Sequence, residues 1–304
     1  MKKLIIPVIL CAALCANIGQ PADAGLFTAY KVRVEKNRIY SDAQKEIKEL
    51  FDRQTDMTNK YDYEGLYQIY SDDFINNDGY DKKVYFKLIK ETWETYPDIT
   101  YQTKIKDIKV YSDYATVQTE ETAYATTTED SEVISARGEL QAYANCVYHL
   151  KKINNRWLIS GENILEEKST LKYGDARFIK MELSAPSFIN AGEDYTSELK
   201  IDLPKEDIVR ASINREIIIQ PASKSEDAFR RLPEDQILER MFISNKDNVN
   251  EYNIASVGVT RAEPIDNTKV RVYMSGLAFV MTRVNVVPEN HFIKLEEDNA
   301  QKSK

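Results

Sequence analysis

Cysteine and histidine are scarce in this chain, and their scarcity removes several kinds of chemistry. The 304 residues include three cysteines, at 11, 15 and 146, and two histidines, His149 and His291. The chain has no two Cys or His pairs that could together form a zinc site, and neither a Gly-rich phosphate loop nor a GxSxG nucleophile motif occurs. We therefore expect no metal site and no cofactor.

Long apolar runs are also missing, apart from one near the start of the chain. Leu4–Ala16 carries no charge and follows two lysines, but it is shorter than the roughly 20 residues that cross a bilayer as a helix. Ala22-Asp23-Ala24 then fits the small-x-small rule for signal peptidase. We expect residues 1–24 to be a cleaved signal peptide and the product to be periplasmic or secreted, with no membrane span.

Cleavage would leave one thiol, so an internal disulfide is excluded. A lipoprotein needs a small residue directly before its lipidated cysteine, but Leu10 precedes Cys11 and Leu14 precedes Cys15. Lipidation is therefore not expected. Cys146 lies in an alternating run whose same-face neighbours are small or apolar, which favours a buried structural thiol over a nucleophile.

An excess of positive charge is absent as well. The chain has 41 basic and 49 acidic residues, a net charge of −8, and loss of the signal peptide makes it −9. Lysine and glutamate are interspersed, as in Lys45-Glu46, whereas a polyanion-binding surface needs a concentrated basic stripe. Nucleic acid is therefore not an expected partner.

Tyrosine and proline usage divides what remains into two parts. Sixteen of the nineteen tyrosines precede position 176, whereas six of the nine prolines follow position 185. Two domains of different construction explain this shift, with a hinge near Leu171–Asp175. The expected parts are an N-terminal extension at 25–37, an α+β domain at 38–170, an all-β domain at 176–290 and a charged tail at 291–304.

Helical signals dominate the start of the first domain. Ser41 and Gln44 form a capping-box pattern, which predicts that the first helix begins there. Asp62 and Asp81 are placed to cap a second and a third helix, the last ending before Pro97. Alternating runs then predict antiparallel strands, at 99–105, 115–119, 134–150 and 157–164.

Several short patterns in this domain resemble a known superfamily. They are Tyr-Asp-Tyr-Glu-Gly-Leu-Tyr at 61–67, Asp-Asp-Phe-Ile at 72–75 with Asp-Gly at 78–79, and Arg-Trp-Leu-Ile-Ser-Gly at 156–161. Over residues 38–166 the chain resembles the nuclear transport factor 2-like superfamily, which includes ketosteroid isomerases and SnoaL-like polyketide cyclases. The resemblance implies a cone of three helices on a curved antiparallel sheet, open at one end.

The second domain matches no family that we recognise, and its fold is inferred from patterns alone. Alternating or apolar runs predict six or more strands, at 179–183, 199–203, 209–219, 237–244, 252–259 and 270–287. We expect a β-sandwich of immunoglobulin-like kind, with a short helix at 225–231. Leu277–Met281 is apolar on both sides and should be central in its sheet or lie against the other domain.

The enzymes of the resembled superfamily work inside the cone, but their catalytic residues are not matched here. A cyclase-like site implies a His and Asp arrangement; His149 has the polar phase of its strand and should be exposed, while His291 falls in the tail. An isomerase-like site implies a carboxylate and an acid, and no residue can be assigned to either role. Asn76, Asp78 and Asp81 offer oxygen ligands without EF-hand spacing, which favours a turn with helix caps over calcium.

Binding is therefore the leading hypothesis: an exported, non-catalytic protein that holds a small organic ligand in the cone or contacts another exported protein. Tyr67, Trp93 and Tyr143 are the candidate ligand-binding residues, because aromatic rings offer flat apolar faces. No catalytic residue is assigned. The alternative is a small-molecule isomerase, cyclase or hydrolase of the cone type, and a homodimer stays open.

Overall fold

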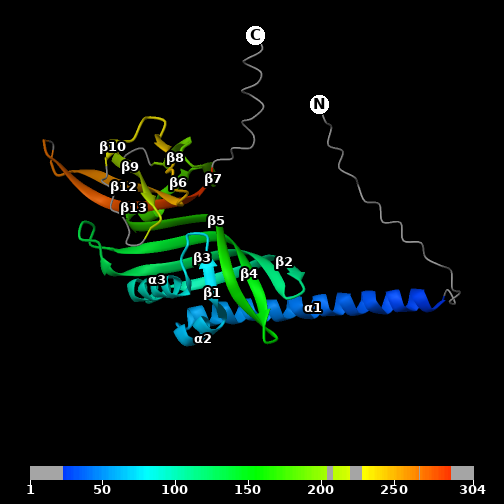
Figure 1. Ribbon diagram of the computed structural model, residues 1–304. Helices are drawn as coiled ribbons and strands as arrows, with labels where there is room; N and C mark the ends of the chain where they lie inside the picture. Colours follow the sequence, from blue (N-terminus) through cyan, green and yellow to red (C-terminus); the bar gives the residue numbers. More distant parts are fainter. Residues whose placement is uncertain (1–22, 204–207, 220–227, 267, 289–304) are drawn as a thin grey trace, which may run out of the picture. The chain divides into compact units, whose positions relative to one another are not determined.

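A computed structural model describes residues 23–203, 208–219, 228–266 and 268–288, with side chains from residue 40 onward (Figure 1). The chain divides into two compact units, residues 1–43 and 44–304. Almost all of the expected signal peptide and the expected tail from 291 lie outside the described residues. Within them, no helix is both long and apolar enough to cross a membrane.

Three helices precede the long strands, as expected, but the first begins earlier than expected. Helix α1 is Asp23–Asn59, so the start predicted at Ser41 is wrong; no proline or glycine interrupts the chain from residue 26 to that point. The other two caps are confirmed. Asp62 accepts a hydrogen bond from the Gly65 amide at the start of α2 (Tyr63–Gln68), and Asp81 does so from the Val84 amide at the start of α3 (Lys82–Thr95).

Most strands belong to one ten-stranded sheet. Its main order is β10-β9-β12-β13-β5-β4-β3-β2, with β1 added parallel to β5 and β7 parallel to β13. The N-terminal strands are β1 (Tyr70–Asn76), β2 (Thr100–Tyr111), β3 (Tyr114–Asp130), β4 (Arg137–Ile153) and β5 (Arg156–Gly174). The C-terminal strands of this sheet are β7 (Phe188–Asn190), β9 (Ile208–Ile217), β10 (Arg230–Arg231), β12 (Glu251–Pro264) and β13 (Val270–Val287).

Strand β5 runs through the segment where the hinge is predicted. It pairs with β4 over nearly its whole length, and from Lys168 to Gly174 it also pairs with β13. Chain direction changes at Gly174, whose φ is +54° and where a Cβ atom would lie 2.3 Å from the Ser275 carbonyl oxygen. The 3-10 helix η1 (Asp175–Phe178) follows. The two sequence halves therefore share one sheet, in which β13 pairs with β5. Leu277–Met281 belongs to β13 and has the central position that its apolar sequence predicts.

A second, three-stranded sheet covers part of the C-terminal half. Its order is β11-β8-β6, from β6 (Lys180–Ser184), β8 (Asp194–Asp202) and β11 (Ile237–Ile243). One apolar cluster joins both sheets, with Leu199 and Ile201 from β8 and Val257 and Val280 from β12 and β13, each at most 4% exposed. An immunoglobulin-like arrangement is not confirmed. Arg230–Arg231 is strand where a helix is predicted, and residues 220–227 lie outside the described residues.

The N-terminal half buries its core between the helices and the inner face of β1–β5. Phe51 of α1 contacts Tyr148 of β4 edge-on, with ring centroids 5.2 Å apart, and Phe86 of α3 contacts Tyr70 of β1 in the same way at 5.1 Å. Cys146 is buried and free, as predicted, and His149 is exposed. The alternation along β4 thus assigns its inner and outer faces correctly.

Candidate functional site

A cavity of about 100 Å³ lies between the helices and the inner face of the sheet. An apolar cavity of about 150 Å³ is large enough for benzene, so this one suits a molecule of a few heavy atoms. Helices α1, α2 and α3 and strands β1 to β4 supply its lining, which we call the cone cavity. The lining residues are Gln54, Thr55, Thr58, Leu66, Tyr70, Tyr85, Ile89, Tyr101, Gln102, Thr103, Glu121 and Tyr148.

Gln54 brings an incompletely bonded amide to the cone cavity. It lies on α1, where Ile47, Leu50 and Phe51 face the core at helical spacing, and it is only 9% exposed. Its Nε2 donates a hydrogen bond of 2.8 Å to the Tyr70 hydroxyl. Its Oε1 is buried and has no hydrogen-bond partner. A buried acceptor without a partner is costly, so this oxygen is a place where a bound donor would be stabilised.

Glu121 supplies a carboxyl group from the opposite wall. On β3 it shares the inward phase with Thr119 and Ala123, while Glu120 faces outward and pairs with Lys106. Thr119 Oγ1 donates to Glu121 Oε1 at 2.9 Å. Burial raises the pKa of Glu121, and hydrogen bonding to Tyr148 and Thr119 opposes the rise.

Glu162 of β5 is a second, more deeply buried acid beside Glu121. It is 4% exposed, and its Oε2 has no hydrogen-bond partner. Burial raises its pKa to about 8, the charge of Glu121 adds to the rise, and hydrogen bonding to Tyr148 and Tyr85 opposes it. Near neutral pH this group is therefore mostly protonated. We call Glu121, Glu162 and the tyrosines at 70, 85 and 148 the cone cluster.

The tyrosines of the cavity are neutral hydroxyl groups at any physiological pH. Burial raises the pKa of Tyr70, Tyr85 and Tyr148, and the nearby glutamates raise each further. Tyr101 responds in the same way, and its pKa rises to about 12. These groups can donate or accept a hydrogen bond, and their rings provide apolar faces.

Positive charge is absent from the described lining of the cone cavity, which contains no lysine, arginine or histidine. Lys82 is a buried cation close to this region, but its Nζ is already bound. It donates to the Tyr70 carbonyl oxygen at 2.9 Å and to Asp72 at 3.2 Å, and it lies 3.9 Å from the centroid of the Tyr67 ring. The cone cluster thus combines two carboxyl groups with neutral tyrosine hydroxyls, and the described lining of the cavity supplies no basic side chain to pair with them.

The three candidate binding residues from the sequence are not brought together. Tyr67 packs against Phe86 and beneath Lys82. Trp93 is buried against Tyr61, and its Nε1 has no hydrogen-bond partner. Tyr143 lies on the outer face of the sheet, in a shallow hollow of about 220 Å³. Their role in ligand binding stays a prediction.

Sequence reasoning missed Glu121 and Glu162, although one signal was available. In the alternating run Thr119-Glu120-Glu121 both glutamates cannot face water, because successive strand residues point to opposite faces. Thr119 is fully buried, which fixes Glu121 on the inner face. For Glu162 no such signal was available, because the register of β5 against β4 is irregular and simple alternation does not tell which face of the sheet Glu162 occupies.

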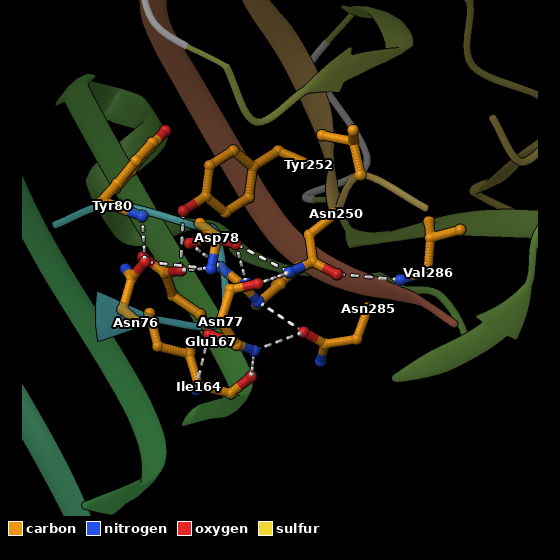
Figure 2. Close-up of polar contacts among 12 residues, drawn as sticks. Asn76, Asn77, Asp78, Tyr80, Ile164, Glu167, Asn250, Tyr252, Asn285 and Val286 are labelled. Atoms are coloured by element: carbon orange, nitrogen blue, oxygen red, sulfur yellow. Dashed lines mark hydrogen bonds and ion pairs between the residues drawn. The ribbon is translucent and has the colours of Figure 1, made fainter. Parts of the chain in front are cut away.

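A second buried acidic group lies where loop 76–81 meets β12 and β13 (Figure 2). Asp78 forms an ion pair with Arg283, and the two side chains are 3% and 0% exposed. Arg283 also contacts Glu167 at 3.5 Å, and the Tyr252 hydroxyl donates to Glu167 at 2.8 Å. Arg283 Nε donates to Asn285 Oδ1 at 2.8 Å. We call these five residues the junction cluster.

The predicted turn at Asn76, Asp78 and Asp81 supports this junction cluster. Asn76 Oδ1 accepts from the amides of Asp78 and Tyr80 at 3.0 and 2.9 Å, and Asn250 Nδ2 donates to Asp78 Oδ1 at 2.8 Å. Asp81 caps α3 instead, so the three side chains serve separate tasks. Within the described residues, no group of three or more His, Cys, Asp or Glu could hold a metal ion.

A more open groove of about 420 Å³ lies between α1, α2 and the turn after β4. Its polar groups include Glu46, which accepts from Trp157 Nε1 at 3.1 Å and from Lys152 Nζ at 2.8 Å. Because the Glu46 carboxylate of this groove is already paired, whereas Gln54 Oε1 of the cone cavity has no partner, the cone cavity is the stronger candidate site.

Comparison with known proteins gives only distant similarities. No family model and no curated protein matches the chain. Among solved structures it is similar to Bdellovibrio bacteriovorus Bd1075, at 14% identity and a TM-score of 0.33, over 40% of this chain and 39% of that one. The chain thus spans about two fifths of that protein.

Two further structures are enzymes by name. A putative scytalone dehydratase from Novosphingobium aromaticivorans matches at 15% identity and a TM-score of 0.36, over 43% of this chain and 86% of that one. Hexachlorocyclohexane dehydrochlorinase LinA-type3 from Novosphingobium barchaimii matches at 15% identity and 0.35, over 43% and 88%. These two enzymes and a nuclear transport factor 2 design are similar to about 40% of the chain.

Proposed function

We propose that this protein is an exported binding protein that holds a small polar organic molecule in the cone cavity. The observation that carries the proposal is the lining itself: a cavity walled by the Glu121 carboxyl, tyrosine hydroxyls and the unpartnered Oε1 of Gln54. A core filled only for stability would place apolar side chains here, because buried polar groups without partners destabilise the fold.

Export is part of the same proposal and rests on the sequence of residues 1–24. Expression of the full chain in a bacterial host should give a product in the periplasmic fraction or the medium that begins near Gly25, as read by N-terminal sequencing. A product that keeps its first residues and stays in the cytoplasm would contradict it. The C-terminal sheets, which we propose form a sandwich that contacts another exported protein, would be tested by crosslinking in that fraction.

Filling the cavity tests the binding proposal directly. Thr58 lines the cavity and bonds its own helix through Oγ1 to the Gln54 carbonyl oxygen at 2.8 Å. Thr58→Met should occupy the space and abolish binding of compounds of three to six heavy atoms, detected by ligand-observed NMR on the full protein.

Thr95→Met is the matched control, because Thr95 makes the same helical bond to the Glu91 carbonyl oxygen at 2.8 Å on the exposed side of α3. Binding should be unchanged in this variant. Failure of every compound to bind the wild-type protein, or equal binding by Thr58→Met, would overturn the proposal.

A second candidate function is proton transfer on a small substrate. It is favoured by one observation: the Glu121 carboxyl and the hydroxyls of Tyr85 and Tyr148 line the same cavity. The raised pKa of Glu121 brings this acid toward neutrality, where a general acid or base is most effective. Such an enzyme should lose activity in Glu121→Gln while still binding its substrate, whereas Glu120→Gln should behave as wild type.

A further inference from the structure

We propose that the molecule held in the cone cavity is a small organic ammonium ion, a protonated amine of a few heavy atoms. This inference rests on the proposed function, since it names the chemical class of the ligand for the same cavity. It follows from the charges, the unpartnered oxygens and the aromatic rings that the described residues place there.

The charge balance of the cavity favours a cation. The carboxyl group of Glu121 lines the cavity, Glu162 is buried next to Glu121 without being a lining residue, and none of the described lining residues is basic. The groups that chiefly shift the pKa of Glu162 are Glu121, Tyr148, Tyr85 and Glu167, so none of them is a cation. A bound ammonium ion would supply the opposite charge that buried carboxylates require.

The unpartnered atoms are oxygens of the kind that an ammonium group satisfies: Gln54 lines the cavity, and Glu162, buried next to Glu121, offers an acceptor once its carboxyl group loses its proton. Gln54 Oε1 and Glu162 Oε2 are buried without hydrogen-bond partners, in residues that are 9% and 4% exposed. An ammonium group has three N–H donors and no acceptor, and Glu121 offers a further carboxylate. An anion would meet like charge here, and an apolar guest would leave these oxygens without partners.

Aromatic rings surround the same space. Tyr70, Tyr85, Tyr101 and Tyr148 line the cavity from β1, α3, β2 and β4. The face of a tyrosine ring attracts a cation electrostatically, most strongly where water is displaced. The volume of about 100 Å³ limits the alkyl part to a short chain such as ethyl or propyl.

Binding of an ammonium ion should release a proton. Glu162 and Glu121 are surrounded by Tyr70 of β1, Tyr85 of α3 and Cys146 and Tyr148 of β4, with Glu167 further along β5; Lys82 of α3 is held by Asp72. These neighbours are neutral or acidic apart from the paired lysine; Arg283, which lowers the pKa of Cys146 and Glu167, is paired with Asp78. Since the pKa of Glu162 is about 8 in the free protein, a bound cation would ionise it near neutral pH.

Isothermal titration of the full protein with ethylammonium chloride and with ethanol tests this inference, because the two probes have the same heavy-atom skeleton. Titrations at pH 7.5 and constant ionic strength, in two buffers of different ionisation enthalpy, report the protons released. Ethylammonium should bind at least tenfold more tightly than ethanol, with a Kd in the millimolar range and a measurable proton release.

Glu121→Gln should weaken ethylammonium binding at least tenfold, while Glu120→Gln, its neighbour on the outer face, should stay within twofold of wild type. The wild-type titrations decide the matter even where a variant does not fold. Equal binding of ethanol without proton release would overturn the ammonium inference and leave the proposed function standing. Failure of both probes, together with failure of the wider compound panel, would overturn both.

Discussion

The cone cluster and the junction cluster each contain one buried and one partly buried acidic side chain, but only the junction cluster contains a cation. At the junction, Arg283 lies between Asp78 and Glu167, with its side chain fully buried. In the cone, Glu121 and Glu162 have tyrosine hydroxyls as neighbours and no basic residue among the described lining. The chain therefore stabilises carboxyl groups away from water in two ways, with a cation at the junction and with tyrosine hydroxyls in the cone.

The difference shows in the ionisation of the acids. Burial raises the pKa of Glu167, but the charge of Arg283 opposes the rise, and Arg283 itself has a raised pKa from hydrogen bonding to Asp78 despite its burial. At Glu162 no cation opposes the rise in pKa, which is opposed only by hydrogen bonding to Tyr148 and Tyr85. Acids that have a cationic partner, such as Asp78 with Arg283, hold loop 76–81 against β13. Acids without such a partner leave room for a cationic ligand.

The largest effect is expected when Arg283, the cation of the junction cluster, is removed, because this eliminates the difference between the two clusters. Arg283→Met would leave the buried Asp78 and the partly buried Glu167 without a counter-charge, and we expect a loss of about 3–5 kcal/mol in the free energy of unfolding. Urea denaturation followed by circular dichroism measures it. Arg271→Met, at an exposed position of the same strand, should change stability by less than about 0.5 kcal/mol. A loss below about 1 kcal/mol at Arg283 would refute the charge argument.

A smaller effect is expected when the unpaired acid of the cone is neutralised. The pKa of Glu162 is higher in the folded protein than in the unfolded chain, so the folded state binds more protons and loses stability as pH rises from about 4.5 to about 8. Glu162→Gln should remove this dependence.

This variant should therefore match wild type near pH 5 and exceed it at pH 9. Since one unit of pKa corresponds to about 1.4 kcal/mol, the rise from 4.5 to about 8 sets an upper limit of about 5 kcal/mol. Relaxation and water penetration around the ionised group reduce this limit, and we expect a gain of about 2–3 kcal/mol at pH 9. Denaturation curves at both pH values, with Glu239→Gln as an exposed control, provide the measurement. An equal effect of Glu162→Gln at the two pH values would contradict the assignment.

The smallest expected change concerns one hydroxyl of the junction cluster. Tyr252→Phe removes the donor to Glu167 and should cost about 1.5 kcal/mol, the lower end for a hydrogen bond to a charged group. Tyr273→Phe removes a hydroxyl that donates to the exposed Glu263 at 2.6 Å and should have no measurable effect. If both variants unfold at the same urea concentration as wild type, the Tyr252 bond contributes nothing.

Local signals explain which parts of the structure could be predicted. Asp62 and Asp81 were recognisable as caps because a cap and its amide lie within three residues. Strand β1 was missed because Asp72 and Asp73 make its sequence polar, while its pairing with β5 depends on residues more than eighty positions away. Loop 76–81 was read as a turn, but its ion pair with Arg283 joins positions 205 apart. Such a contact has no local signature.

The position of β13 in the sheet has a consequence for how the protein is made. It is the last described strand to leave the ribosome, yet it occupies the middle of the sheet, between β12 and β5. Until it arrives, the Lys168–Gly174 edge of β5 has no partner and is open to wrong pairing. We propose that this protein is exported. If export precedes folding, β5 waits for β13 outside the cytoplasm, where wrong pairing with cytoplasmic chains cannot occur.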